Sequence, residues 1–252
     1  MLTHDPEPKE SNTHNNYEFD ITSCNIPTIF YNKDDILVLD NVLSKTECDD
    51  IINFMDTTKN KLCINFNNLS NIIENRCSSF LPIYIYQYDE LLSSNNKHNN
   101  NDQYWSYKNI NPNWRLVRCN INSKLTKHFD GVYVKSVDQK SIYTIMIYLQ
   151  DSDGDLKFNH NLQITPKCGR VVIFNQSLLH EGLENRNHIK YFIRSELMFT
   201  RNLSIETKND KIAMELYNEA KEYNNSDSNK SKLLEEKAFQ LSNLLERMIL
   251  NL

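Results

Sequence analysis

Four β-type segments follow one another between residues 115 and 199, and they constrain the fold more than any other feature of the chain. Each is rich in β-branched and aromatic residues, and Gly, Asp and Asn residues separate them, as in strands joined by turns. The segments are 115–119, 141–149, 170–174 and 191–199. Several short strands bracketed in this way predict a double-sheet barrel of the jelly-roll kind. We therefore expect a mainly β fold with flanking helices.

A candidate metal site lies among these segments. His128 and Asp130 form a His-x-Asp pair, and His180 follows on a later segment. Two residues at i and i+2 of an extended segment project to the same face, so one strand end can offer two ligands. A distant histidine across the barrel mouth would complete a two-histidine, one-carboxylate set, which suits non-haem Fe(II). Zinc is the rival metal, because the same set also serves hydrolytic sites.

All four glycines of the 252-residue chain lie in the same region, at Gly131, Gly154, Gly169 and Gly182. Elsewhere in the chain, Asn, Asp and Ser occupy the predicted turns. Glycine permits backbone conformations that other residues rarely adopt. We therefore expect Gly131 to allow a tight turn beside Asp130, and Gly182 to do the same beside His180.

The sequence divides into three predicted parts, an arm, a domain and a helical hairpin. Residues 1–34 are polar and contain three prolines, which indicates a loose N-terminal arm. A domain over residues 35–204 begins with an apolar strand at 35–40. Ser44 and Glu47 then form a capping box for a helix over about 45–57.

The third part, residues 205–252, is predicted to be a helical hairpin. From about residue 209 the apolar spacing changes to a period near 3.6. The apolar positions are Ile212, Leu216, Ala220 and Tyr223 in one helix and Leu234, Ala238, Leu241, Leu245 and Met248 in the next. The spacing is similar to one degenerate tetratricopeptide unit, and a single unit cannot bury both of its faces. Residues 209–252 are therefore expected to pack on the barrel, on a second copy or on another protein.

Composition narrows the class of protein. The formal net charge of −5 argues against a general nucleic-acid binder, which usually carries a basic excess. The six cysteines form no C-x-x-C motif and no disulfide framework. The polar, acidic N-terminus does not read as a signal peptide, and no apolar run has membrane-spanning length. We expect a protein of the cytosol or nucleus that is neither secreted nor membrane-bound.

Three segments resemble the prolyl 4-hydroxylase-like Fe(II)/2-oxoglutarate-dependent dioxygenases. Residues 180–199 resemble the distal motif of that family: His-Glu-Gly, then Lys-Tyr at 190–191, then Arg194 and a closing Met-Phe. Residues 114–131, with the His-x-Asp-Gly run, are similar to the proximal motif. Residues 166–174 resemble the segment that leads into the distal histidine. The likeness extends over about residues 35–200.

The resemblance implies a double-stranded β-helix oxygenase in which His128, Asp130 and His180 form the catalytic iron site. It implies Fe(II), 2-oxoglutarate and O2, with ascorbate as a further candidate cofactor. Lys190 would pair with the distal carboxylate of 2-oxoglutarate. Lys190 and Arg194 lie four apart on an extended segment, so both can enter the barrel, where a diacid would balance their charge. We favour Lys190 as the main contact and Arg194 as a supporting or alternative one.

The sequence also departs from the family pattern. Cys119 stands where the family often has a tyrosine that touches the cosubstrate, and Asn122 stands where it usually has a glycine. The hairpin at 153–158 is shortened as well. Tyr143 or Tyr148, on the next predicted strand, could replace the missing tyrosine.

The resemblance implies hydroxylation of a protein side chain, with peptidyl proline ranked first. Oxidative demethylation of nucleic acid is an alternative, because the stretch 115–140 is locally basic. Its cations are Arg115, Arg118, Lys124, Lys127, Lys135 and Lys140, against Asp130 and Asp138. A non-catalytic binding module on the same fold is a third possibility, although the complete ligand set argues against it.

Overall fold

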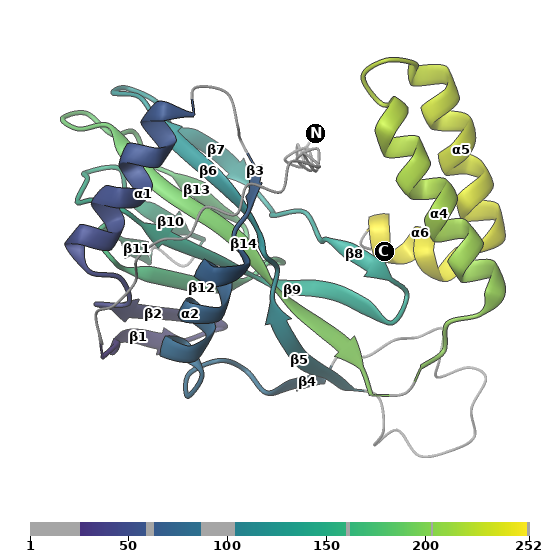
Figure 1. Ribbon diagram of the computed structural model, residues 1–252, viewed down its shortest axis with the longest axis horizontal. Helices are drawn as coiled ribbons and strands as arrows, with labels where there is room; N and C mark the ends of the chain where they lie inside the picture. Colours follow the sequence, from purple (N-terminus) through teal and green to yellow (C-terminus); the bar gives the residue numbers. More distant parts are fainter. Residues whose placement is uncertain (1–25, 59–62, 87–103, 160–161, 203, 251–252) are drawn as a thin grey trace. The chain divides into compact units, whose positions relative to one another are not determined.

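The computed structural model describes residues 26–58, 63–86, 104–159, 162–202 and 204–250 (Figure 1). The chain divides into two compact units. The first comprises Met1–Leu81, Ile110–Gly131 and Ile142–Leu197, and the second Pro82–Asn109, Val132–Ser141 and Met198–Leu252. The domain limits predicted from the sequence, 1–34, 35–204 and 205–252, stay a prediction.

The first unit holds the barrel. Its elements are β1 (Thr28–Lys33), β2 (Ile36–Asp40), α1 (Lys45–Thr57), β3 (Cys63–Asn65), α2 (Asn67–Cys77), β6 (Asn113–Cys119), β7 (Leu125–His128), β10 (Leu156–Phe158), β11 (Gln163–Ile164), β12 (Val171–Asn175) and β13 (His180–Gly182). Two longer strands, β9 (Gln139–Tyr148) and β14 (Lys190–Arg201), contribute residues to both units.

Two sheets of this unit enclose one apolar core. The larger sheet runs β1-β2-β12-β9-β14-β6-β3 and the smaller β11-β10-β13-β7. Val172 is in register with Val38 on one side and Met146 on the other, so these side chains share a face. The core cluster is Ile36, Val38, Met146, Tyr148, Leu156, Phe158, Ile164, Val172, Phe174 and Phe192. The predicted mainly β fold with a jelly-roll core is confirmed.

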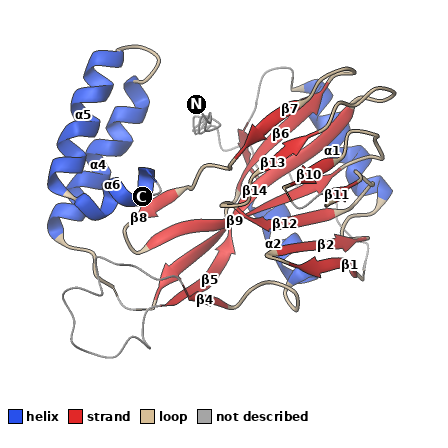
Figure 2. Ribbon diagram, turned by 180° about the vertical axis from the view of Figure 1, so that it is seen from behind, coloured by secondary structure: helices blue, strands red, loops and turns tan. Residues whose placement is uncertain are grey.

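Helices α1 and α2 lie against the other face of the larger sheet, as the two opposite views show (Figures 1 and 2). Trp114 of β6 is completely buried there, and its Nε1 donates a hydrogen bond to Ser70 Oγ of α2 at 2.9 Å. The predicted capping box begins α1: Ser44 Oγ accepts from the Glu47 amide, and Glu47 Oε2 accepts from the Ser44 amide. The helices are thus fixed on the outer face and leave the core face to the sheets.

The structure differs from the predicted arm at Thr28–Lys33, which forms β1 and pairs with β2. The Thr-Ile-Phe-Tyr run supplies the β-branched and aromatic residues that favour a strand, and the neighbouring prolines concealed it. Phe30 is exposed in part but lies under the guanidinium of Arg170, 4.1 Å from its ring centroid. Residues 1–25 of the predicted arm lie outside the described residues.

The prediction that Gly131 and Gly182 supply a glycine-specific backbone conformation was wrong. Of the four glycines, Gly169 alone has a positive φ, of 73°, whereas Gly131 and Gly182 do not. A Cβ on Gly169 would lie 2.0 Å from the Leu43 carbonyl oxygen. Asn122 adopts φ 65°, a left-handed conformation that Asn tolerates better than most residues. This explains how Asn can stand where the resembling family usually has glycine.

The second unit contains the helical hairpin. Its elements are β4 (Tyr84–Tyr86), most of β5 (Tyr104–Ile110), β8 (Val134–Ser136), α4 (Lys208–Tyr223), α5 (Ser228–Leu241) and α6 (Asn243–Leu250). Helices α4 and α5 pack against each other, and both α4 and α6 contact β8. No helix in the described part of the chain is long and apolar enough to cross a membrane.

Two details of the predicted hairpin were wrong. The buried face of α4 consists mainly of Ala213, Met214, Tyr217 and Ala220, whereas Ile212 is exposed. The predicted second helix is interrupted at Ser242, whose φ of −142° and ψ of 98° are extended. The Ser242 hydroxyl accepts a hydrogen bond from the Leu245 amide at 3.0 Å, so it caps a separate helix α6.

Candidate metal centre

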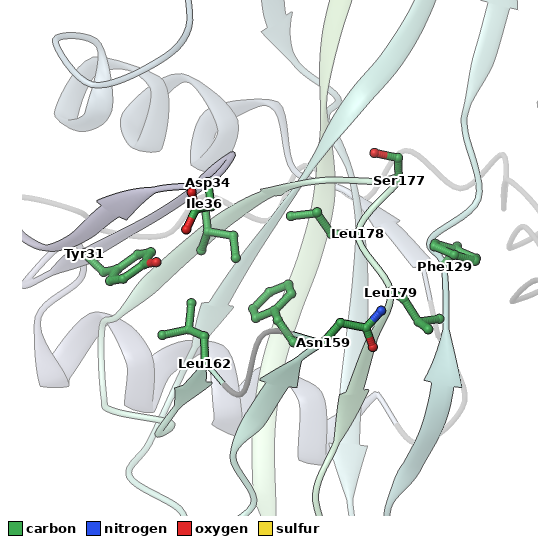
Figure 3. Close-up of a pocket in the computed structure, with 10 residues that line it drawn as sticks. Tyr31, Asp34, Ile36, Phe129, Asn159, Leu162, Ser177, Leu178 and Leu179 are labelled. Atoms are coloured by element: carbon green, nitrogen blue, oxygen red, sulfur yellow. The ribbon is translucent and has the colours of Figure 1, made fainter.

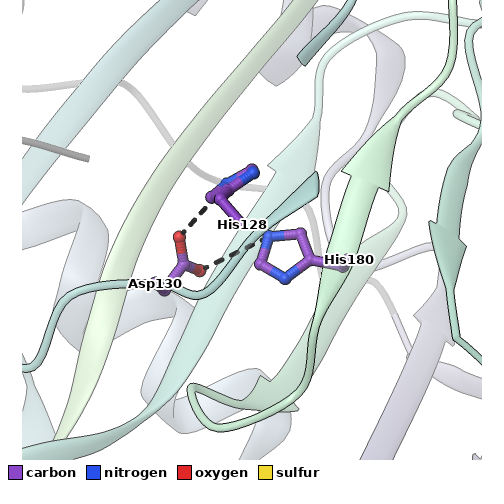
Figure 4. Close-up of side chains that lie close together, drawn as sticks. All are labelled: His128, Asp130 and His180. Carbon is purple, nitrogen blue, oxygen red and sulfur yellow. Dashed lines mark ion pairs between the residues drawn. The ribbon is translucent and has the colours of Figure 1, made fainter. Parts of the chain in front are cut away.

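The smaller sheet brings the three predicted ligands together. His128 is the last residue of β7 and His180 the first of β13, and the two are register partners across the antiparallel pair. Asp130 follows β7 by two residues. The imidazole centroids lie 4.3 Å apart, and Figure 4 shows the carboxylate of Asp130 facing both rings.

Their ligand atoms surround one small volume. His128 Nε2 lies 3.8 Å from Asp130 Oδ1, and His180 Nε2 lies 3.9 Å from Asp130 Oδ2. The ligand atoms of all three residues lie within 4.8 Å of one another, and the three residues are buried. These separations are too long for hydrogen bonds. A metal ion with ligand bonds of about 2.1 Å would bridge them.

Both histidines are oriented by backbone carbonyls. His128 Nδ1 lies 2.7 Å from the Thr126 carbonyl oxygen, and His180 Nδ1 lies 2.9 Å from that of Leu178. A carbonyl oxygen can only accept, so each Nδ1 carries a hydrogen, and each Nε2 is the ring nitrogen that faces Asp130. Burial lowers the pKa of His180 and outweighs the nearby Asp130 carboxylate, which favours the neutral ring that a metal requires.

Asp130 is held as a carboxylate by its neighbours. Oδ2 accepts a hydrogen bond from Thr144 Oγ1 at 2.6 Å, and Oδ1 lies 2.7 Å from Arg194 Nη1. Burial opposes the charge of Asp130, but the charge of Arg194 and the Thr144 hydrogen bond outweigh it. They hold the pKa of Asp130 below its ordinary value. The donor set is two imidazoles and a carboxylate, which fits non-haem Fe(II).

Lys190 and Arg194 open into the same buried cavity as the triad. The other residues that line it are Leu125, Thr144, Met146, Tyr148, Leu156, Phe174, Gly182 and Phe192. Lys190 is 4% exposed, and its Nζ donates a hydrogen bond to the Gly154 carbonyl oxygen at 2.8 Å. Burial lowers the pKa of Lys190. Lys190 and Arg194 therefore line one cavity together with the triad.

The two candidate tyrosines have different positions. Tyr148 is 2% exposed and lines the cavity. Tyr143 does not line it, and its hydroxyl donates a hydrogen bond to Asp35 Oδ1 at 3.2 Å. Successive residues of a strand face opposite sides, so positions 143 and 148 of β9 cannot both face the core. Cys119, at the position of the missing tyrosine, is the register partner of Lys190.

Thr144 and Gly154 are site residues that the sequence reasoning missed. Thr144 shares the inward face of β9 with Met146 and Tyr148, so a small polar side chain among large ones was its available signal. Gly154 acts through its carbonyl, for which the sequence holds no signal. A Cβ at Gly154 would lie 3.0 Å from Lys190 Nζ and 2.9 Å from the Leu183 carbonyl oxygen. The hairpin at 153–158 therefore contacts Lys190 through the backbone of Gly154.

A comparison with known protein families matches the segment that contains this site. Residues 114–195, which contain the triad, Lys190 and Arg194, match the 2OG-Fe(II) oxygenase superfamily. This segment is therefore similar to the 2OG-Fe(II) oxygenases. The matched range includes β6, β7 and β9 to β13 and the start of β14, so both sheets contribute to it. No curated protein matches the sequence.

Several solved structures are similar to this chain. A viral collagen prolyl hydroxylase from Paramecium Bursaria Chlorella virus-1 has 18% identity and a TM-score of 0.45, over 66% of this chain and 97% of that chain. A prolyl hydroxylase from Trichoplax adhaerens has 14% identity and a TM-score of 0.42, over 65% and 83%. A Pseudomonas putida prolyl-4-hydroxylase has 11% identity and a TM-score of 0.38, over 63% and 80%.

Proposed function

We propose that the chain is an Fe(II)- and 2-oxoglutarate-dependent dioxygenase that hydroxylates a protein side chain, with peptidyl proline as the first candidate. One observation carries the proposal. The triad of His128, Asp130 and His180 opens into the same buried cavity as Lys190, within a segment that matches the superfamily. Proline ranks first because the motifs at 114–131 and 180–199 resemble those of prolyl 4-hydroxylases.

In this proposal the three ligands would occupy one side of the metal and leave its other positions open. The Lys190 ammonium would hold the distal carboxylate of 2-oxoglutarate, which would balance a buried positive charge. Met146, Leu156 and Phe192 would enclose its carbon chain and exclude water. When bound, the metal and cosubstrate supply the oxidising chemistry, and the protein supplies position and a dry cavity. Ascorbate stays a candidate that keeps the metal reduced.

A second, larger cavity supports a peptide substrate. It has a volume of about 280 Å³ and is mostly apolar (Figure 3). Phe129, between two ligands in the chain, and Leu179, next to His180, line it, so it lies beside the triad. Phe158 also lines it, with its ring centroid 5.9 Å from that of His180. An apolar side chain such as proline would fit these walls.

The charge of this cavity argues against a nucleic-acid substrate. Asp34 is the charged residue among the described residues that line it, and these include no Lys or Arg. A phosphate backbone is normally met by cations, so a carboxylate at the rim disfavours it. The described cysteines are free thiols, which supports the expected cytosolic or nuclear location. We keep residues 209–252 as the candidate surface for a protein partner or self-association.

The test is turnover of 2-oxoglutarate with defined peptides. Purified protein, loaded with Fe(II), is incubated with proline-containing peptides and with the same peptides carrying alanine in place of proline. We expect succinate release and the mass gain of one oxygen atom on the proline peptides alone. His180→Ala should abolish both, because the metal would lose a ligand.

Other outcomes would redirect the proposal. Oxygen on a residue other than proline would keep the hydroxylase and change the target. Formaldehyde release from methylated oligonucleotides would favour a nucleic-acid demethylase. A wild-type protein that retains neither iron nor 2-oxoglutarate would favour the binding module, and a site that retains only zinc would overturn the oxygenase.

A further inference from the structure

The cavity that holds the triad carries an excess of positive charge. Among the described residues that line it, Lys190 and Arg194 are cations, and Asp130 is the carboxylate. All three are at most 8% exposed. Buried charges interact strongly because little water screens them. The charge of one bound ligand therefore affects the affinity of this cavity for the next.

Arg194 contacts the carboxylate that the metal would need. Its Nη1 lies 2.7 Å from Asp130 Oδ1, the oxygen that also faces His128 Nε2 at 3.8 Å. Thr144 already occupies Asp130 Oδ2 with a hydrogen bond. Asp130 Oδ1 accepts no hydrogen bond of good geometry among the described residues, so its contact with Arg194 is a charge contact. A metal at the triad would share this oxygen with the guanidinium.

The neighbouring acid on β14, Glu196, does not line the cavity. Glu196 shares the strand face of Arg194, and its carboxylate accepts a hydrogen bond from Asn111 at 2.9 Å. Burial raises the pKa of Glu196, and the charge of Arg194 opposes this shift. A divalent metal that enters alone would thus add two positive charges beside two cations and a single carboxylate. A dianion that enters with the metal would offset the two charges that the metal adds and return the cavity to its metal-free balance.

We propose that Arg194 makes metal binding depend on the diacid cosubstrate. The inference rests on the proposed function, since it takes the triad as the metal site. In the metal-free protein Arg194 neutralises Asp130 and keeps its carboxylate in place. With the metal alone, the guanidinium weakens binding by repulsion. When a dicarboxylate binds with the metal, its negative charge offsets the charge that the metal adds beside Lys190 and Arg194, so each ligand tightens the binding of the other.

The experiment measures metal affinity and requires no catalysis. Binding of Mn(II), which mimics Fe(II) without oxidising, is followed by electron paramagnetic resonance with and without 2-oxoglutarate. We compare wild type, Arg194→Met and Arg194→Lys. Arg118→Met is the matched control, because Arg118 lies on neighbouring β6, is exposed and does not line the cavity.

In Arg194→Met, Mn(II) alone should bind tighter by roughly tenfold or more, because a nearby cation has been removed. The gain in Mn(II) affinity that 2-oxoglutarate provides should shrink by a similar factor. Arg194→Lys keeps the charge and should keep most of the gain, and Arg118→Met should behave as wild type. Thermal unfolding of the metal-free proteins checks folding, and Arg194→Met should be the least stable because Asp130 loses its counter-charge.

Failure of the role proposed for Arg194 and failure of the proposed function would give different results. If wild type binds Mn(II) and 2-oxoglutarate but Arg194→Met binds Mn(II) alone equally or more weakly, the role of Arg194 is overturned and the proposed function stands. If folded wild type binds no Mn(II) with or without 2-oxoglutarate, the proposed function itself fails.

Discussion

Thr144 Oγ1 donates a hydrogen bond to Asp130 Oδ2 across 2.6 Å, and both side chains are almost fully buried. Thr144 belongs to β9 of the larger sheet, and Asp130 follows β7 of the smaller sheet. The bond therefore joins the two sheets at the metal carboxylate. With Arg194 beside the other oxygen, rotation of the carboxylate is restricted on both sides.

Thr144→Val should weaken metal binding by about tenfold or more, because outer-shell hydrogen bonds orient ligands at this scale. Valine has nearly the same shape, so the fold should remain intact. The measurement is the Mn(II) dissociation constant. Thr126→Val is the matched control, since Thr126 is exposed and orients His128 through its backbone carbonyl, which the substitution keeps. Equal affinity of Thr144→Val and wild type would show that the bond does not orient Asp130.

Lys190→Met should lower the affinity for 2-oxoglutarate by at least about 30-fold, or about 2 kcal/mol, because the distal carboxylate would lose its buried partner. Isothermal titration of the Mn(II)-loaded protein measures this constant. The variant should fold at least as well as wild type, since it removes a buried ammonium that costs desolvation free energy.

Lys157→Met is the control for Lys190→Met. Lys157 lies on β10 of the smaller sheet, pairs with Glu181 at 3.7 Å, and does not line the cavity. Its loss should leave 2-oxoglutarate affinity unchanged. Retained affinity in Lys190→Met, together with a large loss in Arg194→Met, would instead assign the distal carboxylate to Arg194.

Gly169→Ala should destabilise the fold by about 2–4 kcal/mol, through strain at positive φ and a forced shift of the backbone. The new Cβ would lie 2.0 Å from the Leu43 carbonyl oxygen, and Gly169 O accepts hydrogen bonds from the Val42 and Leu43 amides. Urea unfolding measures the change. Gly182→Ala is the control: its Cβ would lie 3.3 Å from Leu125 Cβ without a left-handed φ, so its cost should be much smaller.

The sequence predicted those features that depend on local pattern. The β segments, the capping box of α1 and the shared face of Lys190 and Arg194 all follow from spacing and residue type, and the structure has them. The triad also came together, because β7 and β13 pair at His128 and His180. The motifs at 114–131 and 180–199, which contain these histidines, were long enough to indicate the fold.

The missed features depend on contacts between distant segments. The need for glycine at position 169 comes from the Leu43 carbonyl, which is far away in sequence. The Thr144 contact required the strand register, and the same register decides between Tyr143 and Tyr148. In α4 the buried stripe lies one residue away from the predicted one, because neighbouring helices select which of two adjacent apolar rows is covered. Periodicity alone does not carry that information.

The last prediction concerns the Asp40–Arg170 pair, which joins the end of β2 to the residue before β12. Arg170 Nε and Nη2 donate to the two Asp40 oxygens at 2.6 and 3.0 Å, and both side chains are largely buried. At pH 7, Asp40→Asn should lower the free energy of unfolding by about 3 kcal/mol, because Arg170 is left without its counter-charge. Asp49→Asn, which affects the exposed pair with Lys45, should cost less than about 0.5 kcal/mol.

The advantage of wild type over Asp40→Asn should also depend on pH. The hydrogen bonds from Arg170, opposed by burial and aided by the Arg170 and Lys167 charges, hold the pKa of Asp40 below its ordinary value. A carboxyl whose pKa is lower in the folded state stabilises the protein above its unfolded pKa of about 3.9. That contribution is lost as the pH falls through the folded pKa. Urea unfolding should therefore show a constant difference from pH 7 to about pH 5 and a shrinking one below about pH 4. A difference that stays constant into acid would mean that packing around Arg170, rather than the charge of Asp40, stabilises this junction.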